Sequence, residues 1–230
     1  MIKPKVLRMI NRFLTVTGIL TVKSSKHGDY AGTSYLEIQD DGTLLLRGDA
    51  TTFDDLRVDS LSWRNGVTAP TVETGFAGDA NHSVVNFLNN QADEIQFPVQ
   101  LPHSWKEGSV VYPHFHYAVF DSASNGTYNV KFILEFYRAD IGESFSTNAK
   151  QTFTMTDTFT SASNDKRYVH AIAQNNLGVA MIDFKISNVW NCRLYRDNTV
   201  ANNFPGKISG LYFDIHFEIG STGSKEEYIK

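Results

Sequence analysis

Apolar and polar residues alternate along much of the second half of the chain, which is the pattern of β-strands that bury one face. The clearest example is the run 213–218, in which the apolar positions are Phe213, Ile215 and Phe217 and the polar positions are Asp214, His216 and Glu218. A period of two over this length indicates a half-buried strand. The run 130–137 is composed almost entirely of residues that favour strands.

From residue 83 onward the chain is predicted to form short strands separated by turns rich in Asn, Ser, Gly and Pro. The predicted strands are 83–88, 94–100, 110–120, 127–139, 150–160, 168–174, 179–189, 190–196 and 210–219. Strands at this spacing predict an all-β fold, specifically an antiparallel, jelly-roll-like β-sandwich. No long helical pattern and no repeat of fixed period interrupts it.

The first 48 residues are expected to be an arm followed by a β-hairpin, with the sandwich domain spanning 49–230. A hairpin is predicted because Tyr35–Gln39 alternates, an Asp-Gly turn follows, and Leu44–Arg47 returns. Residues 6–14 have rough helical spacing, which favours a short amphipathic helix. Lys23–Asp29 is expected to be a loop.

Composition excludes several classes of function. The 230 residues carry a net charge of −4, which argues against a nucleic-acid surface, since such surfaces are normally basic. No stretch approaches the roughly 18 apolar residues of a membrane span. The N-terminus lacks a signal-peptide cleavage pattern, so we expect it to remain in the mature protein.

The N-terminal basic cluster is interpreted as a solvated arm, with contact to packaged nucleic acid as the alternative; it comprises Lys3, Lys5, Arg8 and Arg12.

The most distinctive chemical pattern is a pair of histidines on one predicted strand. Gly108 is followed, after five residues, by His114-Phe115-His116, as in the first metal-binding motif of cupins. Alternation places both imidazoles on one strand face, where they can chelate a metal. His216 would supply a third ligand from a paired strand.

Several features argue against a cupin. Asp121 stands where a cupin carries its ligand Glu, and the spacing around the second motif is too long. We therefore favour an arrangement in which His114 and His116 line the solvated or subunit-facing side, with Phe115 and Tyr117 in the core. This interpretation has no metal and no cofactor, and a site of His114, His116 and His216 is the alternative.

No catalytic residue is marked by the sequence. There is no nucleophile elbow and no phosphate-binding loop. Cys192, the only cysteine, is expected to be a small buried residue. Adjacent carboxylates are expected to be solvated turn residues; these are Asp54-Asp55, Asp93-Glu94 and Glu226-Glu227. Core packing is expected to explain most of the tryptophans, with sugar stacking as the alternative; these are Trp63, Trp105 and Trp190.

Three stretches resemble motifs of a family of tailed-bacteriophage virion structural proteins. They are Gly48–Val58 (GDATTFDDLRV), Leu101–Tyr117 (LPHSWKEGSVVYPHFHY) and Phe213–Lys230 (FDIHFEIGSTGSKEEYIK). The family motifs read GDATx[FW]DDLRV, PHx[YW]KEG followed by HxH, and DFHYxIxxxGS[RK]xEY. Phe53 stands where Trp is common, and Ile215 where Phe is common. The resemblance spans about residues 35–230.

This resemblance implies a structural component of the virion at the head, collar, tail or fibre anchor, without catalytic residues. The expected partners are other virion proteins, such as portal, capsid or tail components. A homo-oligomer is expected too, with a trimer as one symmetric arrangement and residues 1–48 as an assembly contact. Neither membrane nor nucleic acid is an expected partner. A carbohydrate- or receptor-binding module of the virion and a cupin-like metal enzyme stay open as alternatives.

Overall fold

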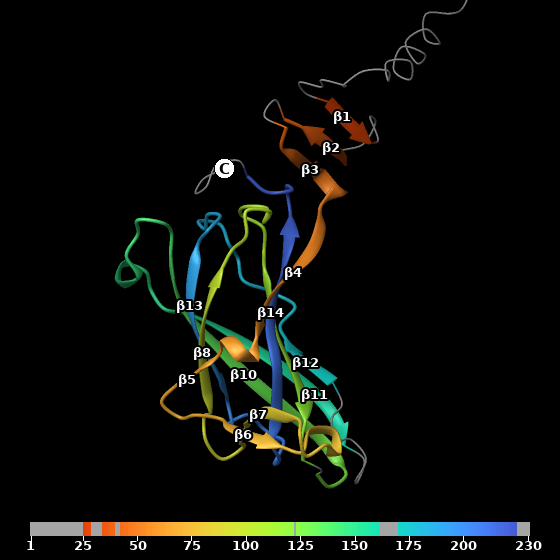
Figure 1. Cartoon of the computed structure of the whole chain (residues 1–230), viewed down its shortest axis with the longest axis vertical. Helices are drawn as coiled ribbons and strands as arrows, with labels where there is room; N and C mark the ends of the chain where they lie inside the picture. Colours follow the sequence, from red (N-terminus) through yellow and green to blue (C-terminus); the bar gives the residue numbers. More distant parts are fainter. Residues whose placement is uncertain (1–24, 29–33, 40–41, 122, 162–169, 225–230) are drawn as a thin grey trace, which may run out of the picture. The chain divides into compact units, whose positions relative to one another are not determined.

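The computed structural model describes residues 25–28, 34–39, 42–121, 123–161 and 170–224 (Figure 1). The chain divides into two compact units, Met1–Ala50 and Thr51–Lys230. The predicted N-terminal helix and the basic cluster fall outside the described residues.

The first unit contains a three-stranded antiparallel sheet in the order β1-β2-β3. Its elements are β1 (Ser25–Gly28), β2 (Tyr35–Ile38), β3 (Leu44–Arg47) and the 3₁₀ turn η1 (Gly48–Ala50). The predicted hairpin is confirmed as β2 and β3. Gly42 has a φ of +89°, a value that favours glycine, and its N–H donates to Gln39 O over 2.9 Å. The loop predicted at Lys23–Asp29 was wrong, because Ser25–Gly28 pairs with β2 and its backbone hydrogen bonds outweigh the low strand propensity of its residues.

The second unit is an antiparallel β-sandwich, as the sequence predicts. One layer has the order β5-β8-β13-β10-β11. Its strands are β5 (Arg64–Asn65), β8 (Glu94–Gln100), β13 (Val189–Arg196), β10 (Gly126–Ala139) and β11 (Gln151–Ser161). The other layer has the order β12-β9-β14-β7-β6, with β4 also paired to β14. Its strands are β12 (His170–Gln174), β9 (Tyr112–Val119), β14 (Ile208–Ile219), β7 (Ser83–Phe87), β6 (Thr71–Thr74) and β4 (Thr52–Asp59).

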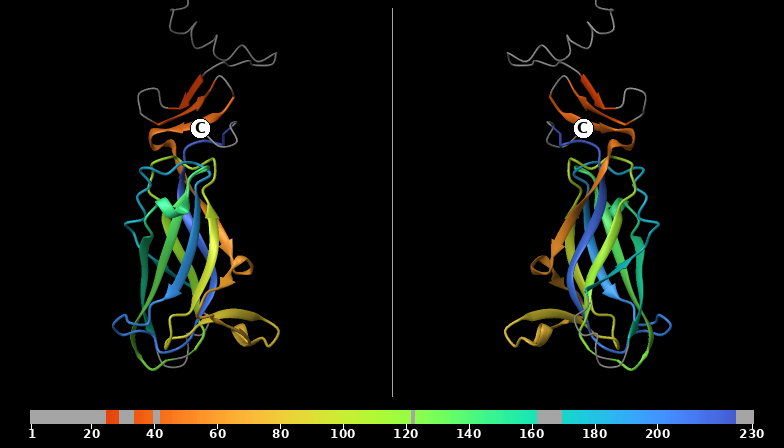
Figure 2. Two further views of the ribbon diagram at one scale, coloured as in Figure 1. Left: turned by 90° about the vertical axis from the view of Figure 1, so that its left-hand side faces the viewer. Right: turned by 90° about the vertical axis from the view of Figure 1, so that its right-hand side faces the viewer.

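The two layers are joined where β11 meets β12, which pair through a single position, Thr156 with Gln174. Figure 2 shows the sandwich from two further sides, with the gold β6–β7 hairpin at one end. Short 3₁₀ turns complete the described elements; they are η2 (Ser60–Ser62), η3 (Phe76–Gly78) and η4 (Phe145–Thr147).

Aromatic side chains from both layers fill the space between them. The ring of Phe132 on β10 lies 4.3 Å from that of Phe115 on β9 and 5.4 Å from that of Phe87 on β7. Phe97 on β8 meets Phe213 on β14 at 4.9 Å. Such ring pairs add to the area-based stabilisation of a core. The inward alternate residues therefore supply shape and stability.

A β-bulge interrupts the pairing of β14 with β9 between Gly210 and Tyr212. The extra residue, Leu211, resets the alternation, so that Tyr212 and the alternate residues after it face outward. A bulge re-aims side chains in this way. Gly210 has no room for a side chain, because an added Cβ would lie 2.9 Å from the rings of Phe87 and Phe115.

The strand predictions succeeded where alternation was strong. The strand predicted at 179–189 was wrong, because the segment before β13 forms two turns, Met181–Phe184 and Lys185–Asn188. Its apolar residues are buried in the core without forming a strand, as with Phe184 and Ile186. Strands β4, β5 and β6 were not predicted.

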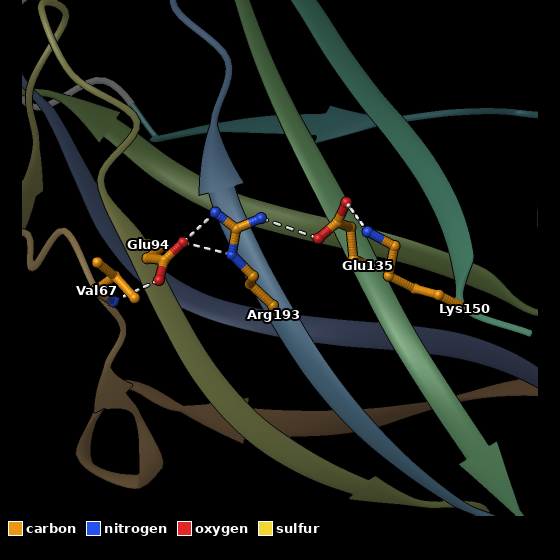
Figure 3. A network of polar contacts seen from close by, with 5 residues as sticks. All are labelled: Val67, Glu94, Glu135, Lys150 and Arg193. Atoms are coloured by element: carbon orange, nitrogen blue, oxygen red, sulfur yellow. Dashed lines mark hydrogen bonds and ion pairs between the residues drawn. The ribbon is translucent and has the colours of Figure 1, made fainter. Parts of the chain in front are cut away.

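A third expectation was wrong, because Asp93 and Glu94 are buried rather than solvated. Glu94 accepts a hydrogen bond from Val67 N and pairs with Arg193, and Arg193 also bonds Glu135 at 2.9 Å. Figure 3 shows this chain of alternating charges, which Lys150 completes at 2.7 Å from Glu135. Burial is possible here because each charge has an opposite partner.

Arg196, at the end of β13, is fully buried between the layers. Its guanidinium donates to the carbonyl oxygens of Phe87 (3.0 Å), Phe204 (2.6 Å) and Gly206 (2.8 Å). Burial lowers the pKa of Arg196 to about 10, against the opposing charge of Asp93. The side chain therefore stays protonated at neutral pH and fixes the loop before β14 to the end of β7.

Candidate functional site

A surface groove of about 520 Å³ lies between the segment before β5, the β6–β7 hairpin and the bulge of β14, and we call it the Trp63 groove. Its apolar lining consists of Leu61, Trp63, Val72, Val84, Val85, Ile95 and Leu211, and its polar lining of Ser60, Asn65 and Ser83. Two of these apolar side chains are unusually exposed, Leu61 at 97% and Val72 at 71%. Exposed apolar residues around a groove are typical of a binding surface.

Trp63 reaches this groove because Gly210 leaves space beneath its ring. The indole lies 6.0 Å from the ring of Phe115, and a Cβ at Gly210 would come within 3.0 Å of it. Trp105 and Trp190 are fully buried, which confirms core packing for two of the three tryptophans. Only Trp63 therefore offers an indole at a groove.

A cluster of histidines and carboxylates occupies the outward face of β9, β14 and β4. The register pairs Asp214 with His114 and Tyr212 with His116. On the other side of β14, His216 pairs with Asp55 of β4. Five residues at these outward positions carry an imidazole or a carboxylate group. We call them the His/Asp cluster; they are Asp55, His114, His116, Asp214 and His216.

The cluster is densely connected. His116 Nε2 lies 3.2 Å from Asp214 Oδ2, and His216 Nε2 lies 2.7 Å from Asp55 Oδ1. The rings of His114 and His216 meet edge to face at 4.2 Å. His116 Nδ1 also lies 2.8 Å from Nε2 of His170 on β12.

Asp214 is the most buried carboxylate of the His/Asp cluster, at 2% exposure. Burial raises its pKa, but the neighbouring imidazoles of His114 and His116 outweigh that effect and bring the pKa to about 2. The side chain is therefore an anion at neutral pH, held against two imidazoles.

The sequence predicted part of this arrangement. His114 and His116 share the outward face while Phe115 and Tyr117 lie in the core, as expected. His216 does lie on a strand paired to theirs. His114 and His116 are buried rather than solvated, however. The structure groups His114 and His216 with Asp214, rather than with His116, as residues that could hold a metal ion. The sequence analysis did not predict Asp214 as a ligand, although the alternation already placed it on the same strand face as His216.

Cys192 confirms the expectation of a buried small residue. It is nearly inaccessible in β13, and burial raises the pKa of its thiol above the usual range. A neutral, enclosed thiol does not act as a nucleophile at ordinary pH.

The parts of the three motif stretches that belong to the second unit lie side by side. The first forms β4, the second leads into β9, and the third forms β14, which pairs with both. The loop of the second stretch is fixed to the third, because Lys106 N donates to Glu218 O at 2.8 Å and Trp105 bridges Ile219.

No protein-family model and no curated protein matches the chain. Solved structures that resemble it include a CBM35 from Cellvibrio japonicus Abf62, at 11% identity and a TM-score of 0.41, covering 70% of this chain and 92% of that one. The CBM22-2 xylan-binding domain of Paenibacillus barcinonensis Xyn10C has 10% identity and a TM-score of 0.35, with 74% and 99% covered.

The stem and receptor-binding domain of spike protein P1 from bacteriophage PM2 is also similar, at 6% identity and a TM-score of 0.27, covering 74% of this chain and 96% of that one. At such low identities and TM-scores, these likenesses say nothing about what this chain binds. Within the described residues, no helix has the length and apolar character needed to cross a membrane.

Proposed function

We propose that this protein is a non-catalytic component of a tailed-phage particle and that it acts by binding a neighbouring virion protein in the Trp63 groove. The observation that carries the binding role is the groove itself, with Leu61 and Val72 exposed at its surface. Apolar side chains in contact with water are stabilised when a partner covers them.

The virion part of the proposal rests on the resemblance, and the packing of the three motif stretches supports it. Residues 52–58, 101–117 and 213–224 are remote in sequence yet form one block around β14. Short motifs that match in order and also pack together are more informative than three scattered matches.

Introducing a charged side chain among the apolar residues of the groove tests the interface. Leu61→Asp places a carboxylate at a side chain that is 97% exposed, so the isolated protein should keep its stability within about 0.5 kcal/mol. Particles assembled with this variant in place of the original chain should contain much less of it, measured by immunoblot of purified particles.

Leu177→Asp is the matched control, because Leu177 is 84% exposed and does not line the groove. This control should enter particles normally. Normal incorporation of Leu61→Asp, or equal loss of both variants, would refute the groove as the contact.

A saccharide receptor is the second candidate occupant, and Trp63 is the observation that favours it. An indole beside the hydroxyl and amide groups of Ser60, Asn65 and Ser83 provides both a stacking surface and hydrogen-bonding groups. A glycan array should then show binding that Trp63→Ala abolishes and Leu177→Asp leaves intact. Absence of binding on the array would remove this candidate without affecting the assembly test.

A further inference from the structure

We propose that His114, Asp214 and His216 form a binding site for a divalent transition-metal ion, with Zn²⁺ as the ion that their chemistry fits. The three residues each offer one ligand atom, and these atoms all lie within 4.8 Å of one another. The site is separate from the Trp63 groove and independent of the function proposed above.

The strand register explains why these three residues meet. Asp214 and His114 are directly paired across β14 and β9, and His216 lies two positions along β14 on the same face. Alternate residues of one strand and the opposite residue of the next are near neighbours on a sheet surface. The backbone of two long strands therefore positions all three side chains.

The separation between two of the three ligand atoms suits a single ion. His114 Nδ1 lies 3.6 Å from Asp214 Oδ1, which is too long for a hydrogen bond. Two atoms that each lie about 2.0–2.1 Å from a tetrahedral ion are about 3.4 Å apart. A shift of a few tenths of an ångström would bring this pair into coordination.

The burial of two unpaired ligand atoms is a second, independent observation that supports a metal site. Nδ1 of His114 and Oδ1 of Asp214 are both enclosed and without a hydrogen-bond partner, in residues that are only 8% and 2% exposed. Buried polar atoms are nearly always satisfied in folded proteins. These two atoms lie 3.6 Å apart, and a cation that contacts both would satisfy both.

The surrounding residues provide the outer contacts that a metal site needs. His216 Nε2 lies 2.7 Å from Asp55 Oδ1, which leaves Nδ1 of His216 to bind the ion. A metal-binding histidine commonly donates its other N–H to a carboxylate, which fixes the ring and raises its basicity. Oδ2 of Asp214 lies 3.2 Å from His116 Nε2, which holds the carboxylate from the far side.

The ligand types select the class of metal. Imidazole suits Zn²⁺, Ni²⁺ and Co²⁺, whereas Mg²⁺ and Ca²⁺ prefer sites made of oxygen. A dication also balances the two carboxylates, Asp214 and Asp55.

The test uses full-length protein without a histidine tag, stripped with a chelator and titrated with ZnCl₂ by calorimetry. The expected result is one ion per chain and a raised Tm. Co²⁺ in place of Zn²⁺ should give visible absorption from a site with nitrogen and oxygen ligands. Absence of binding by both metals would overturn the proposal.

Variants locate the site. Asp55→Asn should weaken Zn²⁺ binding about 10–100-fold, as loss of an outer contact does. His216→Ala, at a side chain that is 40% exposed, should weaken it further, and Asp214→Asn should abolish it. His82→Ala is the control, because His82 is an exposed histidine that pairs with Asp79 outside the His/Asp cluster. Unchanged affinity in His216→Ala, or equal loss in His82→Ala, would refute the assignment even if Asp214→Asn does not fold.

Discussion

Replacing Arg196 with Met is expected to be among the most damaging single changes in the sandwich. Arg196 is fully buried, and its guanidinium satisfies the carbonyls of Phe87, Phe204 and Gly206. Methionine fills similar volume but offers no donor, so these acceptors lose their partner while remaining enclosed. Asp93 also loses the guanidinium whose charge lowers its pKa.

The magnitude follows from these contacts. Each buried acceptor left without a partner costs about 1–3 kcal/mol. Relief of the guanidinium's own burial offsets part of the sum, and broken buried charge networks typically cost about 3–5 kcal/mol. For a chain of this size, each kcal/mol lowers Tm by about 2–4 °C, so the expected shift is about 6–20 °C.

Thermal and urea unfolding followed by circular dichroism would measure this loss. Arg64→Met is the control, because Arg64 lies exposed on the short strand β5 and should change stability by less than about 0.5 kcal/mol. A loss below about 1 kcal/mol for Arg196→Met, or one no larger than that of Arg64→Met, would refute the structural role assigned to this side chain.

Three further predictions concern other features. Burial raises the pKa of Glu135, but Lys150 and Arg193 outweigh this effect and hold the pKa below its ordinary value of 4.5. The stabilisation that ionised Glu135 gives the folded state is therefore complete above pH 4.5 and is lost as the pH falls through the folded-state pKa. Glu135→Gln should make the free energy of urea unfolding fall less steeply in acid, and an unchanged slope would contradict the pairing. Gly210→Ala should cost about 1–3 kcal/mol by overpacking, since its Cβ would lie within 3.0 Å of three aromatic rings; neutral stability in the same assay would place those rings elsewhere. Because burial raises the pKa of its thiol, Cys192 should react with a soluble thiol reagent far more slowly in folded than in urea-unfolded protein, and equal rates would show that β13 is not enclosed.

The sequence predicted the elements whose residues alternate under a single period. β14 is the clearest case, since Phe213 and Ile215 enter the core as expected. The strand predicted at 179–189 failed because apolar residues in a buried turn segment produce the same composition as a strand. β4 went unpredicted because its outward residues are mostly charged and exposed, so the pairing with β14, rather than side-chain propensity, determines it.

The candidate sites depend on contacts between remote segments, which a single sequence does not encode locally. Asp214 joins His114 only through the register of β9 and β14, and that register includes a bulge at Leu211. The Trp63 groove is built from segments 60–65, 72–85 and 210–211 together with Ile95 of β8. Arg196 gives no sign in sequence of being buried, because its hydrogen-bond partners are mostly backbone carbonyls.

The most direct test of the proposed binding role is an electron cryomicroscopy map of the tailed-phage particle to which we assign this chain. The account predicts that the chain occupies ordered density and that a neighbouring virion protein covers Leu61 and Val72 in the Trp63 groove. A particle that lacks the chain, or one in which those side chains face bulk solvent, would contradict it.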